Sequence, residues 1–280
     1  MPNFVPYLFL ALLSIALLTF TIRNKRQPGL LVLFLCFSGM VFVAEFFVLV
    51  IGNAYEYLPD VLSKPYYDNI LGSFPSNLFI IPVLALVASV YSLRFPWLVV
   101  LSASLMGVEW GFEHLHIYHR FWWRREYTFI VLLFFFGFAR LWTGFLHSGH
   151  KWTRFISLWM MCWSSTAIVM FIMSVTGFRF YHYGLYTDIY KDDVFIAATV
   201  GFVKGFILTA FTIGSRKWGW RLFAPVLLYA GDMVLHGFGV LIIQTSLWLY
   251  TLIYLAVASL LLALVVYANN FFAKNQPMFR

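Results

Sequence analysis

Residues 28–52 read PGLLVLFLCFSGMVFVAEFFVLVIG, and this stretch decides the fold. A helix that crosses the roughly 30 Å of membrane hydrocarbon needs about 20 apolar residues, and this run supplies them. Polar and apolar residues do not alternate in it, as they would in a strand of a lipid-facing barrel. Because a helix also satisfies its own backbone hydrogen bonds in lipid, the stretch predicts a membrane-spanning helix. It contains one acid, Glu45.

The rest of the chain repeats this pattern. Of its 280 residues, 62% are hydrophobic and 11% are charged, and the mean hydropathy is +0.84. Soluble domains average about 45–50% apolar and about 25% charged residues, so the composition excludes a soluble enzyme, a disulfide scaffold and a disordered chain. We predict an all-α polytopic bundle of about nine spans (8–9). The runs are 3–22, 28–52, 76–94, 96–116, 127–146, 153–176, 194–214, 222–246 and 247–270.

The positive residues predict the orientation. With the N-terminus outside and the C-terminus in the cytoplasm, eleven Lys and Arg residues lie in inner segments and six in outer ones. This distribution follows the positive-inside rule and is typical of a multi-pass membrane protein. The net charge of +8 is therefore an orientation signal, and no basic stripe indicates nucleic-acid binding. The inner residues are Arg23, Lys25, Arg26, Arg94, Lys151, Arg154, Arg216, Lys217, Arg221, Lys274 and Arg280.

One integral membrane domain over residues 1–280 is the simplest organisation, and no internal repeat is evident in the sequence. Two long outer loops, 53–75 and 177–193, are rich in Tyr and Asp. We expect them to fold as caps over the bundle, because loops positioned by a rigid scaffold carry function disproportionately often.

Ionisable residues inside the predicted spans point to a site. Each costs roughly 2.5–3.5 kcal/mol on insertion scales, so such residues persist where they pair, face a cavity or perform chemistry. Helical spacing places Glu109, Glu113 and His116 on one face, and Asp232 above His236 on another. We therefore expect these faces to converge on one polar cavity open to the outer side. The expected catalytic residues are Glu109, Glu113, Asp232, His236, Glu45 and Lys204.

Three kinds of chemistry suit such a cavity. Paired carboxyl groups in a poorly solvated site hold protons tightly, so Glu109 and Glu113 would form an acid–base pair. A divalent metal is a second interpretation, because carboxylate and imidazole ligands suit Zn, Mn or Fe. Proton or cation transport by the same charges is a third. A structural ion pair, of Glu45 or Asp232 with Lys204, would account for individual residues. The residues of the predicted metal site are Glu109, Glu113, His116, Asp232 and His236.

Two further features bear on the substrate. Arg120, Arg124 and Arg125 follow span four and would bind an anionic lipid head group, although a belt of snorkelling side chains has the same composition. Aromatic residues make up 21% of the chain, and aromatic faces stabilise cations. In this respect the protein is similar in kind to integral-membrane terpene cyclases, in which intramembrane acids protonate an isoprenoid; this is a likeness of composition, without a shared motif.

Residues 45–127 resemble an uncharacterised family of multi-span membrane proteins of spore-forming Firmicutes. The resemblance rests on an acid in span two, the loop NAYEYLPDVL, the stretch YYDNILGSFPSNLFIIPVLAL, and GVEWGFEHLHIYHRFWWRREYTF. It implies a Gram-positive plasma membrane and supplies no activity. The C-terminal half, with Asp232 and His236, departs from the family pattern. The matching positions are Glu45, Tyr57, Pro59, Asp68, Asn77, Glu109, Glu113, His119 and Trp122 or Trp123.

The residues thus favour a membrane-embedded enzyme that acts on a lipid or isoprenoid, with membrane lipids as its partners. A proton- or cation-coupled transporter or channel, and a non-catalytic membrane partner subunit, are the alternatives.

Overall fold

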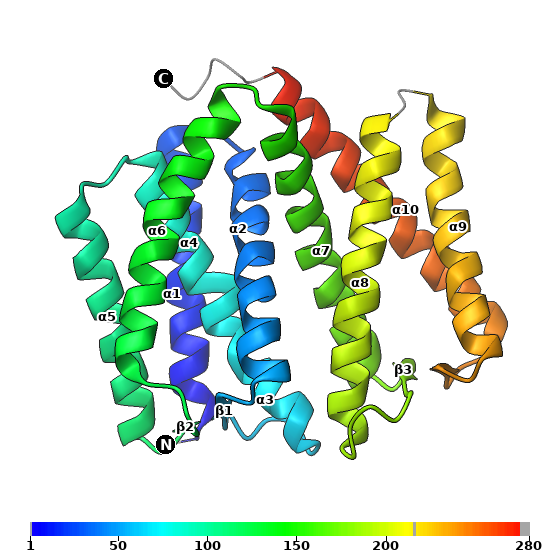
Figure 1. The fold of residues 1–280 in the computed structure, drawn as a ribbon, viewed down its shortest axis with the longest axis horizontal. Helices are drawn as coiled ribbons and strands as arrows, with labels where there is room; N and C mark the ends of the chain where they lie inside the picture. The colour runs from blue at the N-terminus through cyan, green and yellow to red at the C-terminus, as the bar shows by residue number, and fades with distance from the viewer. Residues whose placement is uncertain (1, 215–216, 275–280) are drawn as a thin grey trace. The chain divides into compact units, whose positions relative to one another are not determined.

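The structure, a computed structural model, describes residues 2–214 and 217–274. Long helices joined by short loops dominate it, with two small antiparallel strand pairs (Figure 1). Eight helices in these ranges have the length and apolar composition of a membrane span. The chain is therefore a multi-span membrane protein of α-helices, as predicted. Arg216, Arg280 and the side chain of Lys274, counted above for the orientation, lie outside the described residues.

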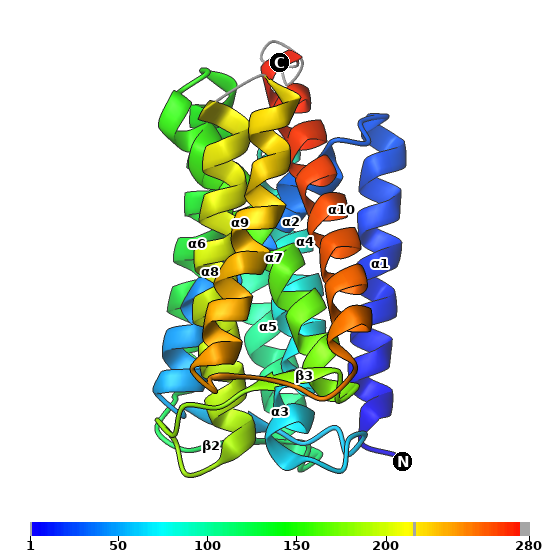
Figure 2. The ribbon, with the colours of Figure 1, turned by 90° about the vertical axis from the view of Figure 1, so that its right-hand side faces the viewer.

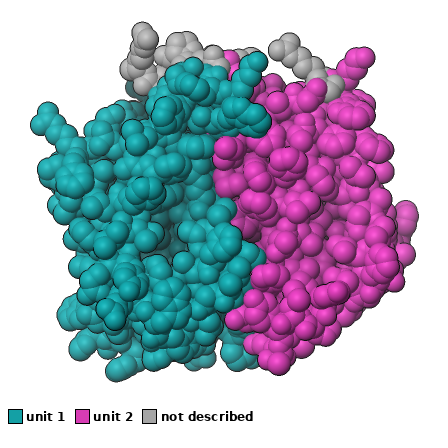
Figure 3. Space-filling model, in the orientation of Figure 1, with its two compact units in different colours: residues 1–153, 276–280 teal, residues 154–275 magenta. Residues whose placement is uncertain are grey.

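The chain divides into two compact units, one of residues 1–153 with 276–280 and one of residues 154–275 (Figure 3). Unit 1 begins with helix α1 and continues with four further helical segments and a strand pair. Its elements are α1 (Phe4–Lys25), α2 (Leu30–Glu45) with the π-helical turn η1 (Phe46–Ile51), β1 (Tyr55–Tyr57), α3 (Pro65–Phe74) with η2 (Pro75–Ile80) and α4 (Ile81–Val90), α5 (Phe95–His114), β2 (Tyr118–Arg120) and α6 (Arg125–His147).

Unit 2 has four helices and a second strand pair. Figure 2 shows α8, α9 and α10 side by side, with β3 at one end of them. The elements are α7 (Lys151–Val175, whose first residues belong to unit 1), β3 (Arg179–Tyr181), α8 (Ile189–Gly214), α9 (Trp218–Gly237), β4 (Leu241–Ile243) and α10 (Leu247–Lys274).

The two units repeat one plan, which the sequence did not reveal. From α2 onward, each runs helix, strand, helix, helix, strand, helix. The strand registers match, because Tyr57 pairs with Tyr118 in unit 1 and Tyr181 pairs with Leu241 in unit 2. After α5 and α9, His116 and Gly239 both adopt positive φ, 57° and 72°. The chain therefore contains a tandem structural repeat, preceded by α1.

Matching aspartates hold the loops that follow β1 and β3. Asp68 accepts hydrogen bonds from the backbone N–H groups of Asp60, Val61 and Leu62, at 2.7–2.9 Å. Asp192 accepts four from the corresponding loop, residues 183–186, at 2.7–3.4 Å. These bonds satisfy backbone donors that would otherwise be lost in a tight loop. Tyr57 and Tyr181 are 124 residues apart, as are Asp68 and Asp192, whereas Tyr118 and Leu241 are 123 apart, so the two units align with one extra residue in unit 1.

Two of the predicted spans differ in their boundaries from the helices of the structure. The third was expected at 76–94, but helix begins at Pro65, since Pro suits the first helical position and Asp68 lies in the first turn. Part of the expected loop 53–75 is therefore helix. The eighth was expected to run to residue 246, but α9 ends at Gly237 and the apolar segment Leu241–Ile243 is strand β4.

Candidate functional site

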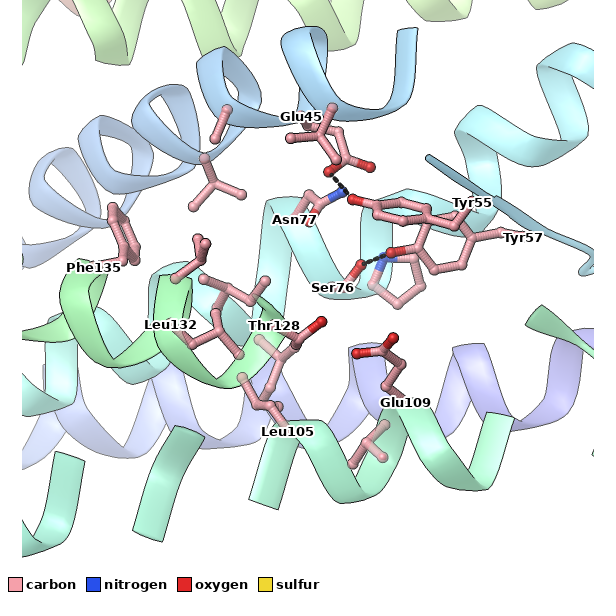
Figure 4. Close-up of a pocket in the computed structure, with 18 of the residues that line it drawn as sticks. Glu45, Tyr55, Tyr57, Ser76, Asn77, Leu105, Glu109, Thr128, Leu132 and Phe135 are labelled. Atoms are coloured by element: carbon pink, nitrogen blue, oxygen red, sulfur yellow. Dashed lines mark hydrogen bonds between the residues drawn. The ribbon is translucent and has the colours of Figure 1, made fainter. Parts of the chain in front are cut away.

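A cavity of about 420 Å³ lies within unit 1. Its walls come from α2 with η1, from η2 and α4, from α5 and from α6, and α1 adds Tyr7 and Leu10. Figure 3 shows a hollow in the side of unit 1, and Figure 4 shows the side chains inside the pocket. Two of the walls are π-helical turns, a rare geometry that occurs frequently at functional sites. This pocket is the candidate site.

Glu45 forms the first polar wall, at the junction of α2 and η1. The hydroxyl of Tyr55 donates a hydrogen bond to its Oε2 atom at 2.7 Å, and Asn77 lies beside it (Figure 4). The other oxygen, Oε1, is buried without a hydrogen-bond partner among the described residues. The carboxyl group is therefore held by Tyr55 and also interacts with the side chain of Asn77.

Glu109 faces the pocket from the opposite wall, on α5 (Figure 4). Thr128 and Tyr118 are its nearest polar neighbours, and the charge of Arg120 acts on it as well. Its Oε1 atom is also buried and has no hydrogen-bond partner in the described part of the chain. Two carboxyl groups thus face one cavity from opposite walls, and no Lys, Arg or His is among the described residues that line it.

Aromatic rings surround these acids. Tyr55, Tyr57 and Tyr118 lie with ring centroids 5.1–5.6 Å apart, and Trp123 lies 5.7 Å from Tyr55. Tyr57 also shares a hydrogen bond of 3.2 Å with Ser76. Burial, and then the charge of nearby Glu45 and the neighbouring tyrosines, raises the pKa of Tyr55 well above its usual value. Burial likewise raises the pKa values of Tyr57 and Tyr118, so all three hydroxyls stay neutral donors.

The opposite end of the cavity is apolar. Phe135 lies there, away from the labelled polar side chains, and Leu105 and Leu132 lie beside Thr128 (Figure 4). Phe134 and Phe138 of α6 also line the cavity. The hollow in Figure 3 lies between the walls of α2 and α6, on the side of the helices. A pocket with one polar and one apolar end, open on the flank of membrane-spanning helices, suits an amphiphilic molecule that enters from the lipid.

Glu113 does not belong to this pocket, which corrects the predicted Glu109–Glu113 pair. The guanidinium group of Arg120 lies 2.6 Å from Glu113, and Arg125 binds the other carboxylate oxygen. Glu113 and Glu109 do share a helix, but Glu113 lies one turn beyond the cavity. The same ion pairs engage Arg120 and Arg125, two of the residues proposed to bind a lipid head group. For the third, Arg124, the structure shows only that it precedes α6.

Lys204 and Asp232 line a second, smaller cavity and not the one that Glu45 and Glu109 line, so the prediction of one cavity shared by all six residues is wrong. Lys204 Nζ is 2.6 Å from Asp232 Oδ1, and Tyr250 donates a hydrogen bond of 2.8 Å to Asp232. The ring centroid of Tyr254 lies 5.0 Å from the ammonium group. This buried ion pair is the structural arrangement that the sequence analysis gave as an alternative for these residues.

The predicted metal ligands do not assemble. His236 donates a hydrogen bond from Nδ1 to the carbonyl oxygen of Leu241, at 2.9 Å, and forms neither a hydrogen bond nor an ion pair with Asp232 in the described part of the chain. His116 lies after the end of α5 in a left-handed turn, because the helix ends at His114 and its period no longer applies. Within the ranges 2–214 and 217–274, no three His, Cys, Asp or Glu residues group closely enough to hold a metal ion.

Sequence reasoning missed much of the pocket. Tyr55, Ser76, Tyr118 and Thr128 were not singled out, because tyrosine and hydroxyl residues are common at membrane interfaces and carry no distinctive spacing. The family resemblance was a better signal. Of the positions that carry it, Glu45, Tyr57, Asn77, Glu109 and Trp123 line the cavity.

Comparison of this chain with protein-family models, with curated proteins and with solved structures found no match. The resemblance to the Firmicutes family therefore stays a prediction.

Proposed function

We propose that the protein is a membrane-embedded enzyme of the plasma membrane that performs acid–base chemistry on the polar end of a lipid or isoprenoid. One observation carries the proposal. Glu45 and Glu109 face one cavity from opposite walls, no Lys, Arg or His is among the described residues that line that cavity, and the cavity continues into an apolar end.

The two carboxyl groups would share the chemistry. One, protonated, gives its proton to the bound molecule, and the other, ionised, takes a proton from it, so that the proton count of the pair is unchanged over a cycle. The hydroxyl of Tyr55 orients Glu45 through its 2.7 Å hydrogen bond. The Tyr55, Tyr57 and Tyr118 rings would stabilise positive charge that develops on the substrate. The phenylalanines of α6 would hold the chain.

A transporter is the second candidate, and the tandem repeat favours it. Internal repeats with binding sites near the middle of the membrane are common in secondary transporters. Against this reading, the two units carry different polar clusters, one open and one closed by an ion pair. The ion pair of Lys204 and Asp232 has the features of a structural support.

Lipid conversion by purified protein tests the enzyme proposal. Wild type and the variants Glu45→Gln and Glu109→Gln are incubated in nanodiscs with a total membrane lipid extract, and the lipids are compared by mass spectrometry. We expect wild type to consume one lipid species and form another, and each variant to lose at least about 100-fold of that rate, as is typical when an acid–base group is removed. Exposed Glu126, on the first turn of α6, gives the matched control Glu126→Gln, which keeps the rate.

If wild type changes no lipid although a lipid copurifies with it, the enzyme proposal is contradicted. Proton or cation flux into liposomes that depends on Glu45 and Glu109 would then establish the transporter.

A further inference from the structure

The repeat allows the two units to be compared position by position, and their cavities correspond. Unit 2 has a cavity of about 40 Å³ where unit 1 has one of about 420 Å³. Asp232 stands on α9 where Glu109 stands on α5, since both precede the matching turns at Gly239 and His116 by seven residues. Leu228 matches Leu105 in the same way. One binding plan is thus present twice, nearly filled in unit 2 and hollow in unit 1.

Lys204 occupies the cavity of unit 2. Counting twelve residues from the loop-capping aspartates, Asp192 and Asp68, leads to Lys204 on α8 and to Ile80 at the end of η2; because a π-helical turn adds one residue to a helix, the counterpart of Lys204 lies at the Ile80–Ile81 step. Both side chains line their cavities. The ammonium group of Lys204 lies 2.6 Å from Asp232 and over the ring of Tyr254, and the side chain is 11% exposed. Carboxylate and aromatic ring together are the usual receptor for an ammonium ion.

Unit 1 has this receptor without the cation. Glu109 and Glu45 both line the cavity, the rings of Tyr55, Tyr57 and Tyr118 stand beside them, and no Lys, Arg or His is among the described residues that line it. The nearest cationic side chain that acts on Glu109 is Arg120, and its guanidinium group hydrogen-bonds Glu113 instead. Ile80 supplies no charge where Lys204 does.

We infer that the cavity of unit 1 binds an amphiphile with an ammonium head group, and that Lys204 in unit 2 shows how the head is held. The head lies against Glu109 and the tyrosines, in the place that Lys204 Nζ takes beside Asp232. The alkyl chain lies along Phe134, Phe135 and Phe138 of α6. This inference rests on the proposed function, for which it names the substrate class.

The comparison also distinguishes Glu109 from Glu45. Glu109 has an acidic counterpart in unit 2, Asp232, and is therefore the anchor of the cationic head. Counted back from Tyr57 and Tyr181, with one residue added by η1, Glu45 corresponds to the Val169–Met170 step of α7, where both residues line the small cavity and neither carries a charge. Glu45 therefore has no acidic counterpart in unit 2 and supplies the second carboxyl group of the proposed acid–base pair only in the open unit.

Binding of dodecylamine, a primary alkylamine, tests the inference. Purified full-length protein in nanodiscs is titrated with radiolabelled dodecylamine at pH 7, where a primary ammonium is charged. Dodecanol, of equal chain length and no charge, is the comparison ligand. We expect wild type to bind the amine about 10- to 100-fold more tightly than the alcohol, and Glu109→Gln to lose that preference, as removal of a charge-assisted hydrogen bond implies. Glu126→Gln retains it.

A second variant, Ile80→Lys, reproduces unit 2 within unit 1. Its ammonium group would bind Glu109 from within the chain, so we expect the melting temperature to stay at or above that of wild type and dodecylamine binding to be lost. If this variant does not fold, the comparison of amine and alcohol in wild type and Glu109→Gln decides the question alone.

The outcomes separate the two proposals. If wild type binds the amine and the alcohol equally well and Ile80→Lys abolishes both, the ammonium inference is overturned. The cavity would still be a pocket for an amphiphile, as the proposed function requires. If wild type, Glu109→Gln and Ile80→Lys all bind both ligands alike, the cavity is no ligand site and both proposals fail.

Discussion

At the scale of single residues, the acids of the predicted spans have three kinds of surroundings with different consequences. Glu113 is neutralised by two arginines and Asp232 by one lysine, whereas Glu45 and Glu109 line a cavity with no Lys, Arg or His among its described lining residues. A paired charge in a membrane protein contributes to folding, whereas an open one is retained at a cost that function must justify. We therefore expect substitutions of Glu45 or Glu109 to affect activity. We expect substitutions of Lys204 or Asp232 to affect the stability of the fold.

Replacement of Lys204 by Met tests the second expectation. It leaves Asp232 buried and uncompensated at 1% exposure, and removal of one partner of a buried ion pair costs about 3–5 kcal/mol. We expect a marked fall in melting temperature by differential scanning fluorimetry. The double variant Lys204→Met/Asp232→Leu should recover much of the loss, and exposed Lys151→Met should show none. A single variant as stable as wild type would mean that the ion pair is not structural.

The tyrosine hydroxyls predict a dependence of stability on alkaline pH. Burial raises the folded-state pKa values of Tyr55, Tyr57 and Tyr118, while in the unfolded chain tyrosine loses its proton near pH 10. Above about pH 10 the folded state therefore binds more protons than the unfolded state, and stability falls as the pH rises. Below that pH these tyrosines are protonated in both states, so they do not make the stability depend on pH. Tyr118→Phe should lessen the alkaline slope of the melting temperature. Titration of all three hydroxyls near pH 10 in the folded protein, seen by absorbance at 295 nm, would contradict this.

At the scale of elements, the strand pair of each unit positions its site. In unit 1, Gly72 allows α3 to pack closely against the strand pair. A Cβ atom at this position would lie 2.5 Å from Tyr57 Cβ and 2.9 Å from Pro59 Cδ. Helix α3 thereby lies directly against β1 and brings Tyr57 to the cavity. Asn69 fixes the register by accepting a hydrogen bond from the Tyr57 N–H at 2.9 Å, as Asp193 does for Tyr181 at 2.6 Å.

Removal of the aspartate that caps the first loop should loosen this assembly. Asp68→Ala leaves the N–H groups of Asp60, Val61 and Leu62 without their acceptor, and each unsatisfied donor costs about 1–3 kcal/mol. We expect faster amide hydrogen exchange over 58–64 and weaker ligand binding in unit 1. Glu56→Gln, in the same strand pair, should behave like wild type. Unchanged exchange in Asp68→Ala would show that other contacts hold the loop.

The elements also show what the sequence reveals and what it conceals. The helices were predictable because long apolar runs in lipid have one solution, and Glu45, Glu109, Lys204 and Asp232 were identifiable as costly. Their partners were not. Helical spacing aligned Glu113 with Glu109, but it gives no information about which arginine from a following strand or helix pairs with either. Polar YYDN at 66–69 looked like loop although Pro65 and Asp68 start a helix there.

At the scale of the whole molecule, the tandem repeat is the main finding that the sequence did not provide. The corresponding positions carry different residues, such as Tyr55 with Arg179 and Ile80 with Lys204, so similarity of letters is lost while backbone geometry remains. In the sequence, the repeat is reflected in the two long loops, 53–75 and 177–193, which are both rich in Tyr and Asp. Since repeated units can diverge separately, one copy can keep a pocket while the other becomes a closed support.

Cysteine accessibility tests the predicted orientation. The chain's two cysteines, Cys36 and Cys162, are both buried, so single cysteines introduced into loops can be read cleanly. A membrane-impermeant maleimide applied to intact cells should label Ser63→Cys, in the loop after β1. It should label Ser148→Cys, between α6 and α7, only after the cells are opened. The reverse pattern would place the tyrosine-rich loops in the cytoplasm.

The most direct test of the central claim is electron cryo-microscopy of the protein purified in native-lipid nanodiscs. We predict elongated density in the cavity of unit 1, with its head between Glu45 and Glu109 and its tail along α6, while Lys204 fills the cavity of unit 2. An empty, collapsed cavity in unit 1, with the two carboxyl groups paired to other side chains, would contradict the account.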